Sequence, residues 1–329
     1  MEYISIPGIK NKVSRIGLGT WSIGGSLWGG TDEKEAIETI KKALSYGINF
    51  IDTAPGYGNG ASETIVGKAI KQHGKRETLV IATKFGLNLE NNGCFRDTRK
   101  DFIKKELENS LKRLQVDYID LYQVHWPDPM TPMEETTEVL NDILKEGKIR
   151  AIGVSNFSVE EMERFRTFST LSASQFPFNL FEREAENTLL PYCKRNKIAT
   201  IAYSPICRGL LSGKMSKSRS FKEDDLRKNM DPKFQEPRFS QYLACTEALS
   251  EWAMRKYNRP LIALAMRWIL DKQMDIALWG ARKPEQLENI DKIEGWKLSE
   301  SDFEEIDKMI SALVKNPIGP QFMAPPLRK

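Results

Sequence analysis

The sequence predicts an α/β fold, a closed (β/α)8 barrel of the TIM type. Eight short apolar segments rich in β-branched residues alternate with helical patterns, at a repeat of roughly 25 to 40 residues. Right-handed connections between that many parallel strands close into a barrel. A doubly wound sheet is the alternative, but the sequence contains neither its dinucleotide fingerprint nor its switch point. A single domain spanning 1–329 is therefore expected.

The first half of the chain supplies a hairpin, four strands and four helices. The hairpin is expected around Pro7-Gly8. The helices are expected to start at good N-cap residues or at Met133, and to stop near glycines such as Gly47 and Gly74. A polar loop is expected over 85–97. The predicted strands are 15–18, 48–51, 79–83 and 118–124. The predicted helices are one capped by Thr31 or Asp32 that runs to about 45, then 62–72, 98–114 and 133–146.

The second half repeats the pattern until the seventh strand. A long segment, 204–240, then shows little periodicity, and a loop of that length inside a compact domain is usually functional. A proline-rich tail, about 315–329, is expected near the mouth of the barrel, the alternative being a disordered end. The predicted strands are 149–154, 173–176, 199–203 and 276–278, and the predicted helices are one capped by Ser158, then 182–196, 242–257, 260–270, 284–293 and 299–314.

Three successive strands end in side chains that suit acid–base chemistry. The second strand ends at Asp52, with Tyr57 on the loop behind it, and the next two end at Lys84 and His125. Because the C-terminal ends of barrel strands face one pocket, these four side chains are expected to meet. The Lys84 ammonium would favour the Tyr57 phenolate and ease proton donation, Asp52 would keep Lys84 charged, and a neutral His125 would orient a carbonyl oxygen.

Each of these four residues also has an ordinary structural explanation. A tyrosine in a glycine-rich loop, a lysine at a strand end, an aspartate capping a helix and a half-buried histidine are all common. Their joint placement favours chemistry, namely protonation of an oxygen that becomes an alkoxide. No side chain donates a hydride, so this reduction requires a cofactor.

Four motifs in order carry a family resemblance: D-T-A-x-x-Y-G at 52–58, A-T-K at 82–84, Y-I-D-L-Y-x-x-H at 118–125 and G-K-I-R-x-I-G-V-S-N-F at 147–157. The chain resembles the aldo-keto reductase superfamily, especially the bacterial NADP-dependent branch that is also similar to potassium-channel β subunits. The likeness extends from Ile16 to Arg282. It implies NADPH-dependent reduction of aldehydes and ketones to alcohols, a catalytic tetrad of Asp52, Tyr57, Lys84 and His125, and a hairpin that plugs the bottom of the barrel.

The same resemblance implies the cofactor contacts. Ser155, Asn156 and Gln175, at the ends of two strands, would bind the carboxamide. Tyr203 would stack on the nicotinamide ring, and the alternative is that Tyr203 is an aromatic residue of the core. Basic residues after strand seven suit phosphates. Arg282, at a helix N-terminus, could fork onto the 2′-phosphate, unless it belongs to a solvated charge run. The predicted NADP(H)-binding set is Gly19, Thr20, Trp21, Asp52, Ser155, Asn156, Gln175, Tyr203, Ser204, Pro205, Ile206, Cys207, Arg208, Gly209, Lys214, Arg227, Gly280, Ala281, Arg282, Gln286 and Asn289.

Aromatic residues are expected to wall the substrate pocket. These are Trp28, Trp126 and Phe322, which would favour hydrophobic aldehydes over sugars. Trp279 departs from the family pattern. Many relatives have a proline at this position, directly before the glycine that corresponds to Gly280. The local pocket is expected to differ there while the backbone path is kept.

Composition excludes several other classes of protein. A net charge of +4 from interleaved charges argues against nucleic-acid binding, and no apolar run of about 18 residues or secretory signal is present. Four cysteines without C-x-x-C spacing suggest reduced thiols in a cytoplasmic protein, and two histidines argue against a zinc site. A monomer or weak homo-oligomer is expected.

Two rivals remain open. One is a nucleotide-sensing subunit that retains NADPH tightly, turns over slowly and binds a membrane protein. It is weakened because no long inactivating segment precedes the hairpin. The other is a metal-dependent barrel hydrolase, which would need more ligands than Asp52 and His125.

Overall fold

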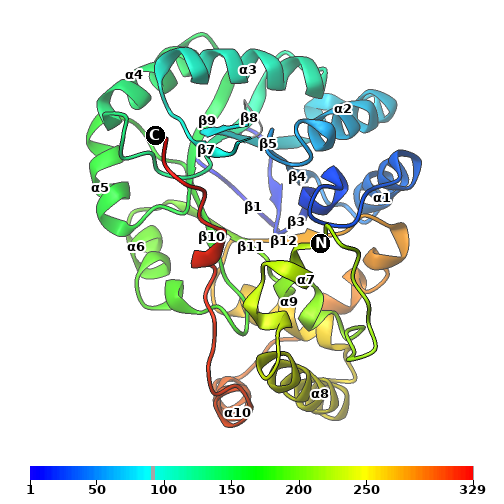
Figure 1. Ribbon diagram of the computed structural model, residues 1–329. Helices are drawn as coiled ribbons and strands as arrows, with labels where there is room; N and C mark the ends of the chain where they lie inside the picture. The colour runs from blue at the N-terminus through cyan, green and yellow to red at the C-terminus, as the bar shows by residue number, and fades with distance from the viewer. Residues whose placement is uncertain (90–92, 329) are drawn as a thin grey trace.

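Eight parallel strands close into a barrel in the computed structural model, which describes residues 1–89 and 93–328 (Figure 1). The predicted (β/α)8 fold is confirmed. Residues 90–92 of the predicted 85–97 loop, and Lys329 of the tail, lie outside the described residues. Neighbouring strands around the ring are β3 (Ile16–Gly19), β4 (Phe50–Asp52), β5 (Val80–Phe85), β8 (Ile119–Val124), β9 (Ile149–Ser155), β10 (Ala173–Pro177), β11 (Ala199–Tyr203) and β12 (Ile276–Gly280).

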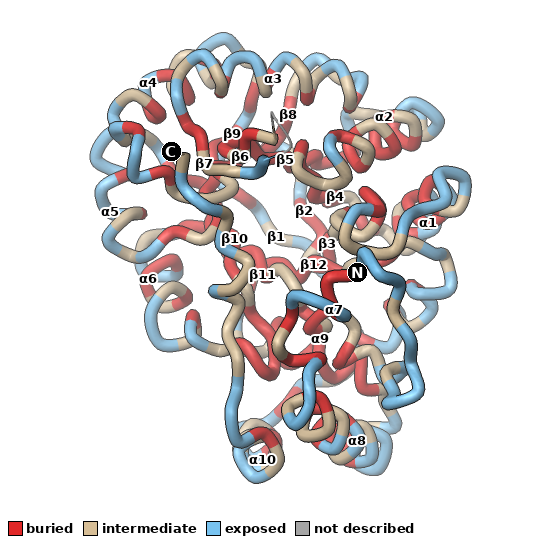
Figure 2. Tube along the Cα trace, in the orientation of Figure 1, coloured by how far each residue is buried: buried red, intermediate tan, exposed pale blue. Residues whose placement is uncertain are grey.

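Helices surround the barrel and turn their buried faces inward (Figure 2). The first begins where predicted, since the Asp32 side chain accepts a hydrogen bond from the backbone N–H of Glu35. The helices are α1 (Glu33–Ser45), α2 (Ala61–His73), α3 (Lys100–Leu114), α4 (Met133–Lys145), α5 (Val159–Phe168), α6 (Leu189–Arg195), α7 (Leu226–Asn229), α8 (Arg238–Tyr257), α9 (Leu261–Asp271) and α10 (Glu300–Leu313).

The N-terminal hairpin of β1 (Tyr3–Ile4) and β2 (Val13–Ser14) closes the bottom of the barrel, as expected. Its side chains Ile6, Ile9 and Val13 are buried in one cluster with residues at the start of the strands, including Phe50 and Val80. The barrel is therefore filled from below by apolar side chains. The opposite end, where the strands finish, is left for polar groups.

The helix predicted over 182–196 is wrong in its first half. The structure has a 3-10 turn at Glu184–Glu186 and then α6 (Leu189–Arg195). Pro191 explains the late start, because in a longer helix its ring would clash with the preceding turn, whereas the first turn needs no N–H from it. Glu182 is not part of a helix, and its buried side chain pairs with Lys233.

The helix predicted over 284–293 is also wrong. Two 3-10 turns, Pro284–Leu287 and Ile290–Ile293, take its place. The indole N–H of Trp279 donates to the Gln286 carbonyl at 3.0 Å. In an α-helix this carbonyl would instead accept a hydrogen bond from the backbone N–H four residues later.

Smaller differences concern caps and loops. Ser62 does not cap α2, because its hydroxyl bonds to Thr20 instead, and α3 begins two residues after Thr98. The predicted polar loop over 85–97 contains a small hairpin of β6 (Leu87–Asn88) and β7 (Phe95–Arg96). Short helical turns occur within 204–240, and α8 begins at Arg238 rather than Tyr242.

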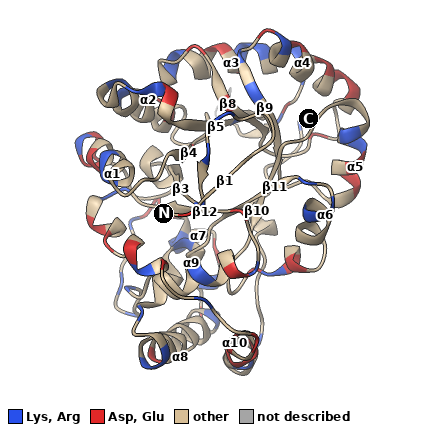
Figure 3. Ribbon diagram, turned by 180° about the vertical axis from the view of Figure 1, so that it is seen from behind, with Lys and Arg blue, Asp and Glu red and all other residues tan. Residues whose placement is uncertain are grey.

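Charged residues are spread around the outside of the barrel, with basic and acidic residues interleaved along the helices (Figure 3). The four cysteines form no disulfide. Among the described residues, no helix combines the length and the apolar character needed to cross a membrane.

Candidate active site

Lys84 lies at the centre of the polar end of the barrel. Its ammonium is fully buried and donates to Asp52 Oδ1 at 2.6 Å, to the Thr53 carbonyl at 3.0 Å and to Tyr57 Oη at 3.1 Å. Asp52 ends β4, and Lys84 lies near the end of β5, the neighbouring strand. The structure thus brings together three of the four residues predicted from the strand ends, through one shared cation.

His125 directly follows β8 and faces the same phenol. Its ring centroid lies 5.8 Å from that of Tyr57, edge to face. The His125 carbonyl accepts a hydrogen bond from the Asn156 amide at 2.9 Å, and the Asn156 oxygen accepts one from the Tyr203 hydroxyl, also at 2.9 Å. Asn156 adopts a left-handed backbone conformation, φ 62°, which an asparagine tolerates better than most residues. These contacts fix both the histidine and the ends of β9 and β11.

Two side-chain amides donate hydrogen bonds to the second carboxylate oxygen of Asp52. Gln175 Nε2 donates to Oδ2 at 2.9 Å and Gln123 Nε2 donates to it at 3.2 Å. Sequence reasoning included Gln175 as a cofactor contact and missed Gln123 altogether. The available signal was a polar residue inside the otherwise apolar strand 119–124.

Burial and charge set the protonation of these groups. Burial raises the pKa of Tyr57 and outweighs the opposing effect of the Lys84 ammonium. Burial also acts to lower the pKa of Lys84, but Asp52 and Tyr57 beside it raise the pKa overall. Burial first, and Lys84 second, hold the pKa of His125 well below its usual value. At neutral pH the site therefore holds a protonated phenol, an ammonium and a neutral imidazole.

The direction for Tyr57 differs from the sequence-based expectation. Lys84 was expected to make the phenol more acidic, and its individual effect does have that sign. The loss of water around the hydroxyl has the larger effect, so the phenol is held protonated until charge develops next to it.

A cavity of about 500 Å³ opens above these residues. Three tryptophans form part of its wall, and the Trp21 and Trp28 rings meet edge to face with centroids 5.2 Å apart. The tail contributes Phe322 to Pro326, so all three predicted substrate-pocket residues line this cavity. The other predicted residues that line it are Gly19, Thr20, Trp21, Asp52, Tyr57, His125, Ser155, Asn156, Gln175, Tyr203, Ser204, Pro205, Ile206, Arg208, Gly209, Arg227, Gly280, Arg282 and Gln286.

The tail is tied down on both sides of the cavity. Arg328 pairs with Asp97 at 3.1 Å and with Asp128 at 3.0 Å, and both carboxylates are buried. Arg96 donates to the Pro325 carbonyl at 2.9 Å. At the other end the Phe322 ring lies against the Arg208 guanidinium, 5.1 Å from its centroid.

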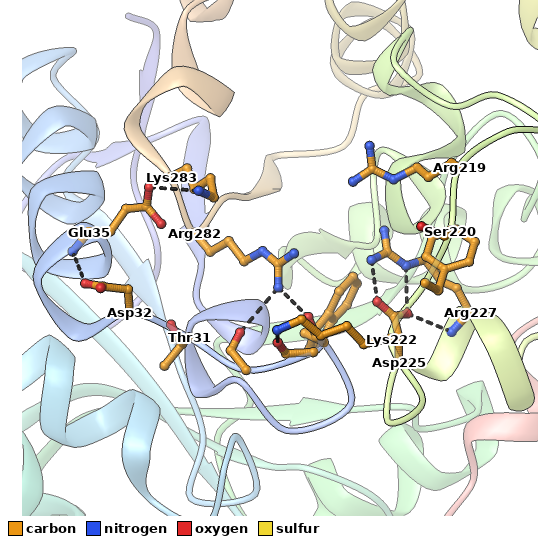
Figure 4. A pocket seen from close by; sticks show the side chains of 14 residues that line it. Thr31, Asp32, Glu35, Arg219, Ser220, Lys222, Asp225, Arg227, Arg282 and Lys283 are labelled. Carbon is orange, nitrogen blue, oxygen red and sulfur yellow. Dashed lines mark hydrogen bonds and ion pairs between the residues drawn. The ribbon is translucent and has the colours of Figure 1, made fainter.

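A second cavity of about 450 Å³ adjoins the first and shares Trp28, Arg219, Arg227 and Arg282 with it (Figure 4). Arg227 forks onto Asp225, with its closest contact at 2.6 Å, and Arg282 reaches back to the Trp28 carbonyl. Within residues 1–89 and 93–328, the Arg219 side chain has no hydrogen-bond or ion-pair partner. Burial and the neighbouring Arg227 lower the pKa of Arg282, as expected for cations gathered without enough anions.

Arg208 lines the first cavity, and its predicted phosphate role stays a prediction. Its guanidinium is buried and pairs with Asp231 at 2.9 Å and with Glu182 at 3.6 Å. Lys233 completes this buried cluster, 2.8 Å from Glu182. The acids that neutralise Arg208 lie 23 and more residues away in sequence, so the local pattern gave no sign of them. Four further members of the predicted cofactor set line neither cavity: Cys207, Lys214, Ala281 and Asn289.

No group of three or more His, Cys, Asp or Glu side chains suited to a metal ion occurs in the described part of the chain. The acidic groups near Tyr57 are instead matched to Lys84 and to amides. The arrangement suits proton transfer to a bound oxygen.

Comparison with known proteins agrees with this geometry. Residues 15–311 match the Aldo/keto reductase family. The chain is 56% identical to the aldo-keto reductase YhdN of Bacillus subtilis (strain 168), over 100% of this chain and 99% of that one. It is 38% identical to the NADH-specific methylglyoxal reductase of Escherichia coli (strain K12), over 95% and 99%. Among solved structures, the glycerol dehydrogenase AKR11B4 from Gluconobacter oxydans superposes with a TM-score of 0.87 at 47% identity, over 98% and 99%. The chain therefore belongs to the aldo/keto reductase family, and it is an oxidoreductase that acts on carbonyl substrates.

Proposed function

We propose that this chain reduces aldehydes and ketones to alcohols with NADPH, and that Tyr57 is the proton donor. The observation that carries the proposal is the Lys84 ammonium, which touches both Asp52 and Tyr57 beneath an aromatic cavity. A phenol next to a buried cation can give up its proton when a neighbouring oxygen becomes basic, since the cation stabilises the phenolate that remains.

The chain's own residues perform the acid chemistry. Tyr57 stays protonated at neutral pH and donates to the carbonyl oxygen as that oxygen gains negative charge. His125 stays neutral and can donate a hydrogen bond to the same oxygen, which fixes the carbonyl in the cavity. A reduced nicotinamide, when bound, supplies the hydride that no side chain provides.

The two adjoining cavities fit an extended dinucleotide. Residues at the strand ends would hold the nicotinamide end of the cofactor. Gln175 lies there, and its Nε2 donates to Asp52. Within the described residues, nothing donates a hydrogen bond to Gln175 Oε1. That oxygen is therefore an acceptor for a carboxamide. Tyr203 would stack on the ring, and Ser155 and Asn156 would help to hold its amide group.

The second cavity favours a phosphorylated cofactor. Five basic and three acidic side chains line it, so it retains positive charge for a 2′-phosphate. Within residues 1–89 and 93–328, three of these cations have no carboxylate partner: Arg219, Lys222, which donates to the Gly29 carbonyl, and Arg282. The NADH-specific relative from Escherichia coli makes this preference a quantity to measure, by comparing the KM for NADPH with that for NADH.

The wall of the first cavity favours small, apolar carbonyl compounds. Trp21, Trp28, Trp126 and Phe322 offer flat apolar surfaces. Two similar proteins are named for small polar three-carbon compounds, methylglyoxal and glycerol, so methylglyoxal is a suitable substrate to compare with the aromatic 4-nitrobenzaldehyde.

The test is NADPH oxidation with both aldehydes by the wild type and by Tyr57→Phe. We expect turnover by the wild type, and a loss of about 100-fold or more in kcat in the variant, with NADPH binding retained. Equal rates would refute the role of Tyr57. Tight NADPH binding without turnover in either protein would favour the nucleotide-sensing function, and absence of NADPH binding would refute the cofactor assignment.

A further inference from the structure

Gln123 occupies an interior position of the barrel beside the proton-donating group. It lies on β8, in register with Lys84 on β5 and with Gly153 on β9. A Cβ on Gly153 would lie 2.9 Å from Gln123 Cγ, closer than real Cβ contacts, so the glycine leaves the room that this amide needs. The Gln123 side chain is fully buried and does not line the cavity.

The amide completes a chain of hydrogen bonds that ends at the phenol. Gln123 Oε1 accepts from Gln175 at 3.3 Å, and its Nε2 donates to Asp52 Oδ2. Asp52 Oδ1 in turn accepts from Lys84, which donates to Tyr57. A buried carboxylate needs several donors to remain an anion, and each oxygen of Asp52 has its own set.

We propose that Gln123 is a positioning residue for the proton donor. Its hydrogen bond to Asp52 Oδ2 orients the carboxylate so that Oδ1 contacts Lys84, and this contact keeps the Lys84 ammonium charged and in place beside Tyr57. This inference rests on the proposed function. Gln175 makes the same bond to Asp52, but it also lines the cavity, so a change there would disturb bound ligands as well. Gln123 does not line the cavity, and its shorter hydrogen bond leads through Asp52 and Lys84, whereas its longer one, 3.3 Å, is accepted from Gln175.

The first test is Gln123→Leu, which keeps the size of the side chain and removes both hydrogen bonds. We expect kcat to fall about 10- to 100-fold, the effect of losing one hydrogen bond to a buried charged group, with KM and the Kd for NADPH nearly unchanged. The alkaline limb of the kcat profile should move to lower pH, because a less firmly held Asp52 stabilises the Lys84 ammonium less well.

Tyr122→Phe is the matched control. Tyr122 is the adjacent residue on β8, equally buried, and its side chain stacks on Phe85 away from the site. Its hydroxyl has no hydrogen-bond partner in the described chain. We expect wild-type kcat and the wild-type pH profile. A wild-type kcat and alkaline limb in Gln123→Leu as well would overturn the proposal, even if the variant were less stable.

Gln123→Glu provides a second variant if the leucine variant does not fold. The charged side chains facing this position are Asp52, which the amide touches, and Lys84, its partner in register. A protonated glutamic acid can still donate to Asp52, whereas an ionised one repels it. We therefore expect activity that recovers as the pH falls. A profile identical to that of the wild type would contradict the proposal.

A readout without activity separates this inference from the proposed function. In protein labelled with 13C at lysine Cε, the Lys84 signal, identified by its loss in Lys84→Met, should titrate at lower pH in Gln123→Leu than in the wild type. If no carbonyl compound is reduced but this shift occurs, the proposed function fails and the role of Gln123 stands. An unshifted titration refutes the role of Gln123.

Discussion

The pair of Lys84 and Asp52 gives the sharpest stability prediction. Both side chains are almost completely buried and 2.6 Å apart. Lys84→Met keeps most of the volume but leaves Asp52 as a buried carboxylate without its cation. Breaking a buried pair by removing one partner costs about 3–5 kcal/mol of unfolding free energy, because the remaining charge is uncompensated.

This loss converts into a measurable melting temperature. An unfolding entropy of about 2.1 cal/mol/K per residue gives about 0.7 kcal/mol/K for a chain of 329 residues. Lys84→Met should therefore melt about 4–7 °C below the wild type at neutral pH. Calorimetry of the two proteins in the same buffer without nucleotide measures the difference.

A double variant distinguishes lost charge balance from lost packing. Asp52→Asn combined with Lys84→Met removes both charges and retains an oxygen for the amides of Gln123 and Gln175. We expect it to regain at least half of the lost melting temperature. A single variant within about 1 °C of the wild type, the effect of an exposed pair, or a double variant no more stable than the single one, would refute the reasoning.

Two further predictions concern pH and the tail. Folding holds the pKa of His125 well below its usual value, so the stability that it contributes is present above about pH 6.5 and is lost as the pH falls, when only the unfolded chain takes up the proton. Urea unfolding of His125→Gln should therefore show about 2 kcal/mol less loss between neutral pH and about pH 5 than the wild type, and an equal loss would contradict this. Arg328→Ala should raise the KM for aldehydes about three- to tenfold and leave the Kd for NADPH unchanged, because it frees the tail from Asp97 and Asp128. Arg164, an exposed arginine paired with Glu134, provides the control substitution, and an unchanged KM in Arg328→Ala would show that the tail does not shape the substrate site.

Much of the barrel could be read from the chain, because strand and helix patterns are local. Apolar β-branched runs placed all eight strands, and the structure selects Asp32 from the two expected caps of α1, Thr31 and Asp32. The tail was harder to place. Its proline-rich sequence carries no period, and only its pairing with buried carboxylates shows where it lies.

Local patterns failed where distant residues compete for the same group. Over 182–196 the composition is helical, but Glu182 is drawn into a buried cluster with Lys233, 51 residues later, and Pro191 prevents an early start. Arg208 was predicted to bind a phosphate from its local sequence alone, which gave no sign of its buried pairing with Asp231 and Glu182. In both cases the deciding partner is far away in sequence.

The sequence alone determined the fold and which side chains could meet at the polar end of the barrel, since parallel strands deliver their C-terminal residues to one place. Only the tertiary structure decided how they are tuned. It placed the Lys84 ammonium between Asp52 and Tyr57, and it showed that burial raises the pKa of the phenol despite that cation. It also brought Gln123 to the back of Asp52. Burial and hydrogen-bond partners depend on residues from several strands at once, so no single stretch of sequence contains them.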